Sequence, residues 1–278
     1  MKSEALAIVT VRPFQLFICA IAIIQPSWAE SVLPGAVLGL ATALNGQSVA
    51  YLDDDSKTQG YLARPQNRSV RGGVLLIHEW DGLTLRIKEI ADAFAEVGYI
   101  ALAVDLYHGK VGKSRSEKLA LVRATRADPE GISRNLNAAL QAVRADPAIK
   151  GSIATIGWCF GGGIALNFAI EGEDHEGTAV FYGRLLDDPE LLKHIHHEVY
   201  GTFAGLDRGP TVGEVDRFVA ALRSAGVPND VHVYDDVQHG FWLHVDRDPA
   251  ANRAPAQDAW QRLLAYLERV STAQTVSN

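Results

Sequence analysis

Short apolar runs alternate with amphipathic stretches along most of the chain. Residues 73–77 have the sequence GVLLI, a continuous apolar run that is typical of a strand buried on both faces. Apolar residues then recur at helical spacing over residues 83–97, and Gly98 supplies the left-handed stop of a helix. The next apolar run, residues 100–104, predicts a second strand.

This alternation continues toward the C-terminus. Further strands are predicted at residues 152–156, 178–182, 199–204 and 230–234, and further helices at 116–126, 129–145, after Gly161, 211–224 and 255–270. Strands separated by helices pair in parallel, so we expect an α/β fold, a mostly parallel sheet with helices on both faces. Ahead of it, residues 48–52 and 60–63 flank a polar turn and predict an antiparallel hairpin at the sheet edge.

The first 29 residues have the layout of a secretory signal peptide. Basic residues precede an apolar stretch at residues 14–24, and Pro26 and small residues up to Ala29 follow it. The stretch is too short for a membrane span, which needs about 20 residues. We therefore expect cleavage after Ala29, a single mature domain at residues 30–278, a periplasmic or secreted location and no stable membrane association. An uncleaved interfacial anchor is the alternative.

Charge and cysteine content narrow the function. The net charge is −7 and the sequence has no basic stripe, which argues against a nucleic-acid partner. A small-molecule substrate is favoured, either neutral or with a charge that nearby residues of the site complement. After cleavage Cys159 would be the only cysteine, which excludes an intramolecular disulfide. A lone thiol in an oxidising compartment needs either deep burial or a chemical role.

The sequence around Cys159 indicates a chemical role. Residues 157–161 are GWCFG and lie between a predicted strand and a predicted helix, the arrangement of a nucleophile elbow with cysteine in place of serine. The turn is so tight that glycine is needed two residues before and after the nucleophile. The helix N-terminus favours a thiolate over a thiol. The alternative is a buried structural cysteine in a glycine-rich turn.

An acid and a base follow the nucleophile in the order that this elbow requires. Asp207 follows the strand predicted at residues 199–204, and His239 follows the one at 230–234. We expect His239 to shuttle protons while Asp207 fixes its tautomer and orientation. The alternative is that Asp207 is a turn residue and His239 a loop histidine.

The loop HEWDG at residues 78–82 follows the first buried strand. We assign an oxyanion hole to the backbone amides of Trp80 and Phe160, because two such donors stabilise the charge of a tetrahedral intermediate. Glu79 would then lie close to the sulfur, where it acts as a proton acceptor or a gate. The alternative is that Glu79 is an exposed loop carboxylate with no role in the reaction.

Five segments together resemble the dienelactone hydrolase family. They are GWCFGG, HEWDG, VDLY at residues 104–107, AGLD and QHGF, and they occur in order between about Gly72 and Val270. The resemblance implies the α/β-hydrolase fold, with Cys159, Asp207 and His239 as the triad and Glu79 as the carboxylate that takes the thiol proton when substrate arrives. It also implies a carboxymethylenebutenolidase-like reaction: thiolate attack on an ester or lactone carbonyl, followed by hydrolysis of a thioester, without a metal or cofactor.

The substrate pocket is expected to include Tyr107, Lys110 and Trp242. Family members that act on dienelactone hold the substrate carboxylate with arginines, one after the DLY segment and one past the catalytic histidine. Here the first region contains Lys110, which is the candidate replacement for one of these arginines. A lysine offers a point charge, whereas the guanidinium of arginine binds a carboxylate with two hydrogen bonds. The spacing of His194, His196 and His197 lacks the carboxylate or cysteine partner of a metal site and favours a solvated polar patch.

These observations favour a cysteine-type ester or lactone hydrolase acting on a small molecule, as a monomer or small homo-oligomer. A general extracytoplasmic carboxylesterase is one alternative, and a non-catalytic ligand-binding protein on the same fold is another. A thiol redox sensor would need a second, resolving cysteine in the mature chain.

Overall fold

The computed structural model describes residues 32–40 and 43–273. The predicted signal peptide lies outside the described residues, so cleavage after Ala29, the domain boundary and the location stay predictions. Eight strands form one sheet: β1 (Gln47–Val49), β2 (Gly60–Ala63), β3 (Gly72–Ile77), β4 (Tyr99–Ala103), β5 (Ile153–Trp158), β6 (Gly177–Phe181), β7 (Val199–Ala204) and β8 (Asn229–Tyr234). Their order is β1-β2-β4-β3-β5-β6-β7-β8.

The strand pairings confirm the expected α/β fold. β1 and β2 form the antiparallel edge, β2 also pairs antiparallel with β4, and every other pair is parallel. The helices are α1 (Leu85–Glu96), α2 (Arg115–Arg126), α3 (Pro129–Arg144), α4 (Phe160–Glu171), α5 (Pro189–Leu192), α6 (Val212–Ser224) and α7 (Pro249–Ala273), with short 3-10 turns η2 (Gly35–Leu38) and η3 (Val245–Arg247). Within the described ranges, no helix combines the length and apolarity needed to cross a membrane.

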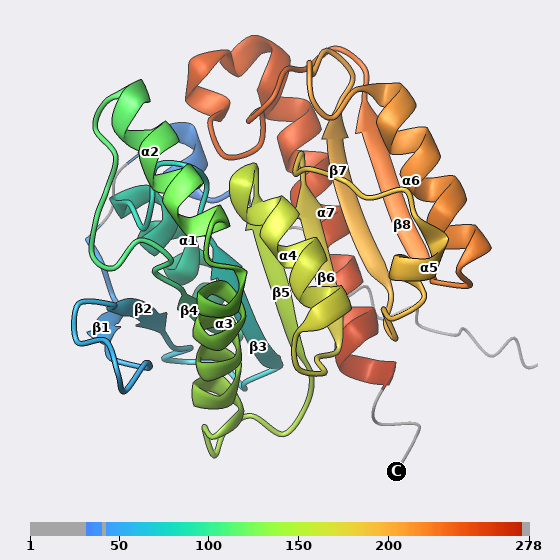
Figure 1. The fold of residues 1–278 in the computed structure, drawn as a ribbon. Helices are drawn as coiled ribbons and strands as arrows, with labels where there is room; N and C mark the ends of the chain where they lie inside the picture. The colour runs from blue at the N-terminus through green and yellow to red at the C-terminus, as the bar shows by residue number, and fades with distance from the viewer. Residues whose placement is uncertain (1–31, 41–42, 274–278) are drawn as a thin grey trace, which may run out of the picture.

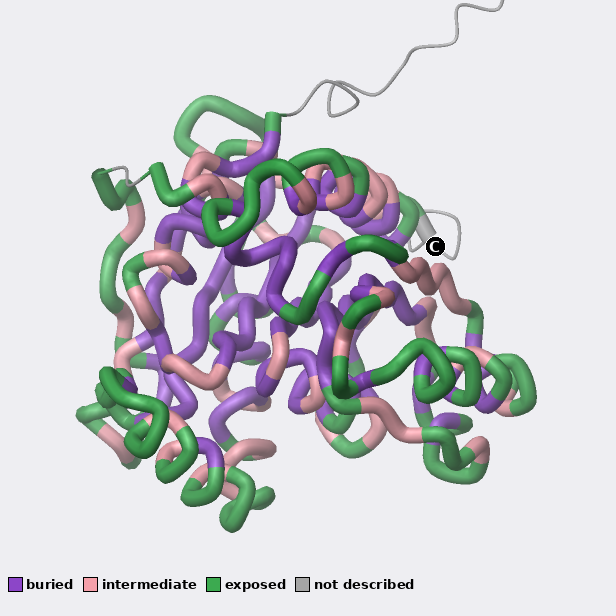
Figure 2. Tube along the Cα trace, turned by 90° about the horizontal axis from the view of Figure 1, so that it is seen from above, coloured by how far each residue is buried: buried purple, intermediate pink, exposed green. Residues whose placement is uncertain are grey.

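Side-chain alternation along β3 explains why helices cover both faces of the sheet. Leu76 belongs to the same buried cluster as Phe94 of α1 and Trp260 of α7. Leu75, one residue earlier, belongs to a second cluster with Leu136 of α3, because successive strand residues point to opposite faces. Figure 1 shows α3 and α4 in front of the sheet and α7 behind it. The strands form a buried layer between exposed helical surfaces (Figure 2).

The last helix begins earlier than the sequence pattern predicts. Pro255 was expected at its start, but α7 starts at Pro249 and contains Pro255 in its interior. The reason is local, since Asp248 Oδ1 accepts a hydrogen bond from the Ala251 N–H at 3.2 Å and so caps the earlier turn. The short helix α5 and the two 3-10 turns carry no periodic pattern and were not expected.

Two histidines pack against β5 and β6, at the end of the sheet where β6 begins: His175 is buried and His197 is half-buried. The rings of His175 and His197 lie 4.7 Å apart, and Nε2 of each hydrogen-bonds with the Thr178 hydroxyl at 3.0 and 2.9 Å. Burial lowers the pKa of His175, and burial followed by the charge of His175 lowers the pKa of His197 to about 3. His197 therefore belongs to a buried polar cluster, while His194 and His196 are exposed as expected.

We predict that this pair makes the protein sensitive to acid. When the pKa of a histidine is lower in the folded state than in the unfolded state, the unfolded state binds more protons below about pH 6.5. The free energy of unfolding therefore falls as the pH drops from about 6.5 toward about 3. The slope is at most about 1.4 kcal/mol per pH unit for each histidine. Urea unfolding of His197→Gln should show a shallower decline than wild type. His194→Gln, which changes an exposed histidine of the same segment, should keep the wild-type slope; a loss of slope in both variants would contradict the assignment.

Candidate active site

Cys159 lies at a strained turn between β5 and α4. Its φ is 53°, in the left-handed region that residues with a Cβ rarely adopt. A Cβ on Gly157 would lie 2.1 Å from the Gly161 carbonyl oxygen, and one on Gly161 would lie 2.2 Å from the Ile77 carbonyl oxygen. Both positions therefore exclude every side chain. The contacts press the start of α4 against the end of β3 and leave the Cys159 side chain half-buried at the turn.

The loops after β7 and β8 are joined by backbone hydrogen bonds, which brings two polar side chains together. The Leu206 N–H donates to the Val237 carbonyl at 3.0 Å. Next to this contact, His239 Nδ1 donates to Asp207 Oδ2 at 2.7 Å, and Asp207 Oδ1 accepts the Gly209 N–H at 3.0 Å. The side chain of Asp207 is only 4% exposed, so its carboxylate is committed to these contacts.

The imidazole of His239 links this carboxylate to the sulfur. Burial lowers the pKa of His239, but the interactions with Asp207 and with Cys159 outweigh burial and raise the pKa to about 10. The ring therefore carries both protons at neutral pH and places a cation beside the sulfur. Tyr182 packs edge-on against this ring, with centroids 5.0 Å apart.

The two residues predicted to supply the oxyanion-hole amides belong to elements that meet at the elbow. Phe160 is the first residue of α4, where N–H groups have no partner within the helix. Trp80 lies in the loop after β3, directly beyond the point where Gly161 contacts the Ile77 and His78 carbonyls. His78 fixes this loop, because its Nδ1 donates to the Glu79 carbonyl at 2.7 Å while its Nε2 accepts the Leu106 N–H at 3.2 Å.

Glu79 is buried, and His244 is its side-chain partner. His244 Nε2 donates to Glu79 Oε1 at 2.8 Å. Burial raises the pKa of Glu79, but the hydrogen bond from His244 and the charges of Arg247 and Lys118 lower it overall, so the carboxylate is ionised at neutral pH. The alternative of an exposed loop carboxylate is therefore wrong, since Glu79 is 6% exposed.

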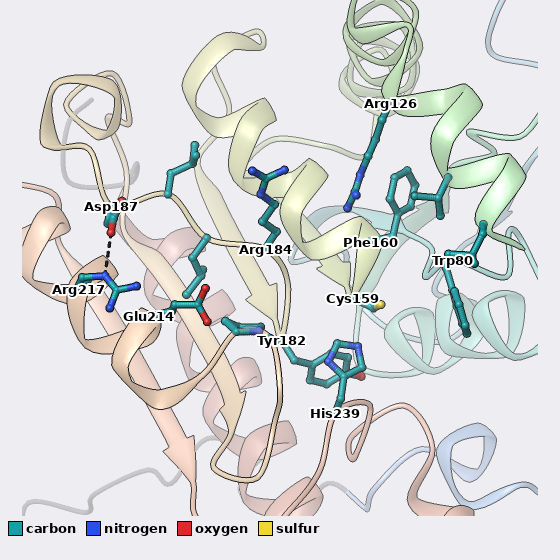
Figure 3. Close-up of a pocket in the computed structure, with 16 residues that line it drawn as sticks. Trp80, Arg126, Cys159, Phe160, Tyr182, Arg184, Asp187, Glu214, Arg217 and His239 are labelled. Carbon is teal, nitrogen blue, oxygen red and sulfur yellow. Dashed lines mark hydrogen bonds and ion pairs between the residues drawn. The ribbon is translucent and has the colours of Figure 1, made fainter. Parts of the chain in front are cut away.

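A cavity of about 540 Å³ opens above Cys159. Its wall includes Trp80, Leu119, Val122, Arg126, Phe160, Tyr182, Arg184, Leu185, Leu186, Asp187, Gly209, Pro210, Glu214, Arg217 and His239. Figure 3 shows Arg126 and Arg184 projecting into it from the side opposite His239. Residues 32–40 and 43–273 contain no group of three or more His, Cys, Asp or Glu side chains placed to hold a metal ion.

Comparison with known proteins decides the family. The model of the dienelactone hydrolase family matches residues 58–271, which includes every element that carries the site. The chain belongs to the dienelactone hydrolase family. It is 27% identical over 260 residues to a protein of Saccharolobus solfataricus provisionally named a carboxymethylenebutenolidase, which covers 81% of this chain and 99% of that protein. It is 30% identical over 239 residues to "Protein usf" of Aquifex pyrophilus, covering 82% and 100%.

Solved structures support the fold. A dienelactone hydrolase-like promiscuous phosphotriesterase from metagenomic libraries superposes with a TM-score of 0.72 at 23% identity, covering 82% of this chain and 99% of that one. At this identity the likeness shows the fold alone. This dienelactone hydrolase family member therefore has the α/β-hydrolase architecture, and the chemistry of its site has to be argued from its own residues.

The three residues predicted to form the substrate pocket do not line the cavity. Trp242 is fully buried and stacks on Trp158 with ring centroids 5.6 Å apart. Tyr107 is 1% exposed and supports the oxyanion loop from below, because its hydroxyl donates to the Trp80 carbonyl at 3.2 Å. Lys110 is exposed and lies at a separate, smaller cavity beside α2 and α3. Trp242 therefore packs in the core, and Tyr107 supports the loop that carries Trp80.

Three residues at the site were missed by sequence reasoning: Arg126, Arg184 and His244. Tyr182, which directly follows β6, is expected from the sequence to line the pocket together with Trp80, and both line the cavity. His244 was assigned no role from the sequence. Its position five residues after His239 was a usable signal. Arg126 and Arg184 reach the cavity from the end of α2 and from the loop after β6, and no local pattern distinguishes them from other surface arginines.

We predict that Gly161→Ala disrupts the elbow. The added Cβ would meet backbone oxygen, which has no flexible end to move aside, so overpacking should cost about 3 kcal/mol or more and abolish activity. Gly213→Ala is a matched control, because Gly213 is also the second residue of a helix and its nearest contact would be Arg217 Nη1 at 3.9 Å. Thermal denaturation should show a lowered Tm for the first variant and an unchanged or raised Tm for the second; equal Tm values would refute the steric argument.

Proposed function

We propose that this protein hydrolyses an ester or lactone through Cys159 as the nucleophile, His239 as the proton shuttle and Asp207 as the residue that orients His239. The observation that carries the proposal is the imidazole of His239, which hydrogen-bonds with Asp207 and lines the same cavity as Cys159. Following the sequence-based expectation, the reaction takes place outside the cytoplasm. A non-catalytic binding protein would not need a strained nucleophile turn joined to an acid and a base.

The acylation step uses groups that are already in place. The Cys159 sulfur attacks the carbonyl carbon, and the resulting oxyanion accepts hydrogen bonds from the Phe160 and Trp80 amides. The His239 imidazolium then gives its Nε2 proton to the leaving oxygen as the carbon–oxygen bond breaks. The product of this step is a thioester on Cys159 and a neutral His239. In the mechanism that the resemblance implies, Glu79 takes the thiol proton when substrate arrives, so the attacking sulfur is a thiolate, and Glu79 returns this proton to the thiolate after deacylation.

Deacylation reverses the proton transfer. Neutral His239 removes a proton from water, the hydroxide adds to the thioester carbonyl, and collapse expels the Cys159 thiolate with release of the carboxylic acid. The His239 side chain is 38% exposed, so water reaches it. Asp207 keeps Nδ1 protonated throughout and so leaves Nε2 to face the reaction.

Removal of the sulfur tests the proposal. Cys159→Ala should lower kcat/KM for an activated short-chain ester by at least about a thousandfold, because nucleophile and base act as a unit. Since the thiol also contributes to the raised pKa of His239, the same variant should show His239 titrating below about 10 in NMR spectra. Intact-mass analysis of wild type with a slow ester should place the acyl group on Cys159. Full turnover by a correctly folded Cys159→Ala would refute the proposal.

The cavity also carries a charge preference. Arg217 is paired with Asp187 at 3.0 Å, and Glu214 accepts the Thr211 N–H at 2.7 Å. In the part of the chain that the structure describes, Arg126 and Arg184 have no carboxylate partner; Arg126 lies over the Phe160 ring, 5.6 Å from its centroid. We therefore propose that the preferred substrate carries an anionic group that these two arginines bind.

A pair of esters tests this preference. Arg184→Met and Arg126→Met should each raise KM for an anionic aryl hemiester by about five- to tenfold and leave KM for the neutral aryl acetate nearly unchanged, because only the anion loses a partly exposed ion pair. Lys110→Met is the control, since Lys110 lies outside this cavity and should affect neither ester. Equal effects on both esters would contradict the assignment of an anion site.

A further inference from the structure

A chain of polar contacts, buried at Glu79 and His244 and partly exposed at Arg86 and Asp246, connects Glu79 to helix α1. His244 Nε2 lies 2.8 Å from Glu79 Oε1, and the two side chains are 10% and 8% exposed. The other ring nitrogen of His244, Nδ1, lies 3.0 Å from Nη1 of Arg86. Arg86 forms a two-bond ion pair with Asp246, with both distances 2.8 Å. Four side chains from separate parts of the fold thus form one network.

The guanidinium of Arg86 determines which nitrogen of His244 is protonated. A guanidinium has donors and no acceptor, so Nδ1 of His244 can only accept from it and carries no proton. The oxygen of ionised Glu79 is an acceptor, so Nε2 of His244 carries the single ring proton and donates it. A second proton on Nδ1 would set two donors against each other at 3.0 Å.

The charge of Arg86 is matched within the network. The hydrogen bonds to Asp246 raise the pKa of Arg86, so the guanidinium stays charged and its charge is matched by that carboxylate. Nη1 also donates to the Leu243 carbonyl at 2.9 Å, so its two hydrogens are shared among three acceptors. The other cations that act on Glu79 are Arg247 and Lys118.

The network reaches the wall of the cavity through the chain neighbours of its members. Trp80, the residue after Glu79, lines the cavity that holds Cys159. Leu243, the residue before His244, donates its N–H at 3.3 Å to the hydroxyl of Tyr182, which lines the same cavity. Burial raises the pKa of Tyr182, and the charges of Glu79 and Cys159 raise it further. The carboxylate and its histidine partner therefore lie directly behind the wall of the candidate site.

We propose that Arg86 and His244 are positioning residues: Arg86 holds His244 as a neutral imidazole protonated on Nε2, and this imidazole orients the Glu79 carboxylate toward the reaction centre. The inference rests on the proposed cysteine hydrolase. A neutral donor fixes the direction of the carboxylate without compensating its charge, so Glu79 keeps more of its ability to accept a proton than a carboxylate in a salt bridge would.

NMR of the histidine rings in the full chain tests the protonation state without reference to turnover. In wild type, the ¹⁵N shifts of His244 should show an unprotonated Nδ1 and a protonated Nε2 from about pH 6 to about pH 8, a range that includes the ordinary histidine pKa of about 6.5. In Arg86→Met, which removes the opposing donor, His244 should gain a second proton within that range. A doubly protonated His244 in wild type at about pH 7 would overturn the proposal; so would an unchanged spectrum in a folded Arg86→Met. If that variant does not fold, the wild-type spectrum decides.

Two amide variants test the positioning role. His244→Gln places an amide N–H at the reach of Nε2 and keeps the donor to Glu79, whereas His244→Asn keeps only an acceptor near Arg86. His244→Asn should lower kcat/KM by about tenfold and shift the acidic limb of the pH–rate profile, and His244→Gln should stay within about threefold of wild type with an unshifted profile. Equal losses in both variants with an unshifted profile would show a merely structural role. An inactive wild type with the expected NMR spectrum would sink the proposed function and leave the tautomer assignment standing.

Discussion

The approach of α4 to the carboxyl end of β3 is the constraint on which the whole site depends. Gly161 lies so close to the Ile77 carbonyl that no Cβ fits between them, and Gly157 is packed equally tightly against Gly161. This contact accompanies the left-handed conformation of Cys159, whose φ is 53°. Because the contact joins a buried strand to a helix, the position of the sulfur is fixed by rigid elements, whereas Asp207 and His239 reach it from loops that are joined by backbone hydrogen bonds.

Two carboxylates of the candidate site are buried, and each is satisfied in a different way. Asp207 pairs with the imidazole of His239, whose pKa is raised to about 10, so the ring is charged at neutral pH. Glu79 pairs with His244, whose second nitrogen faces the guanidinium of Arg86. In the proposed mechanism, one histidine supplies a mobile proton, while the other supplies direction only. What each ring does is determined by the group behind it: an acceptor behind His239 and a donor behind His244.

Features with a local sequence signature could be predicted. The buried strands, the glycine spacing around Cys159, and the order of Asp207 and His239 each depend on a few adjacent residues and on fold topology. The start of α7 was misplaced because Pro255 is a strong helix-start signal, whereas the decisive cap is the side chain of Asp248. Trp242 was assigned to the pocket because it follows His239 closely, yet its indole is large enough to be held in the core by Trp158.

The cavity wall could not be predicted, because it is assembled from segments distant in sequence. Arg126 ends a helix about 30 residues before the nucleophile and Arg184 follows the next strand, so only the packed sheet brings them to one cavity. Net charge says little about the cavity for the same reason. The chain carries a net charge of −7, but salt screens exposed charges beyond about 8 Å, so remote surface carboxylates affect the cavity weakly. Arg126 and Arg184 line the cavity itself, so a bound molecule meets these two cations at short range, whatever the charge of the whole protein.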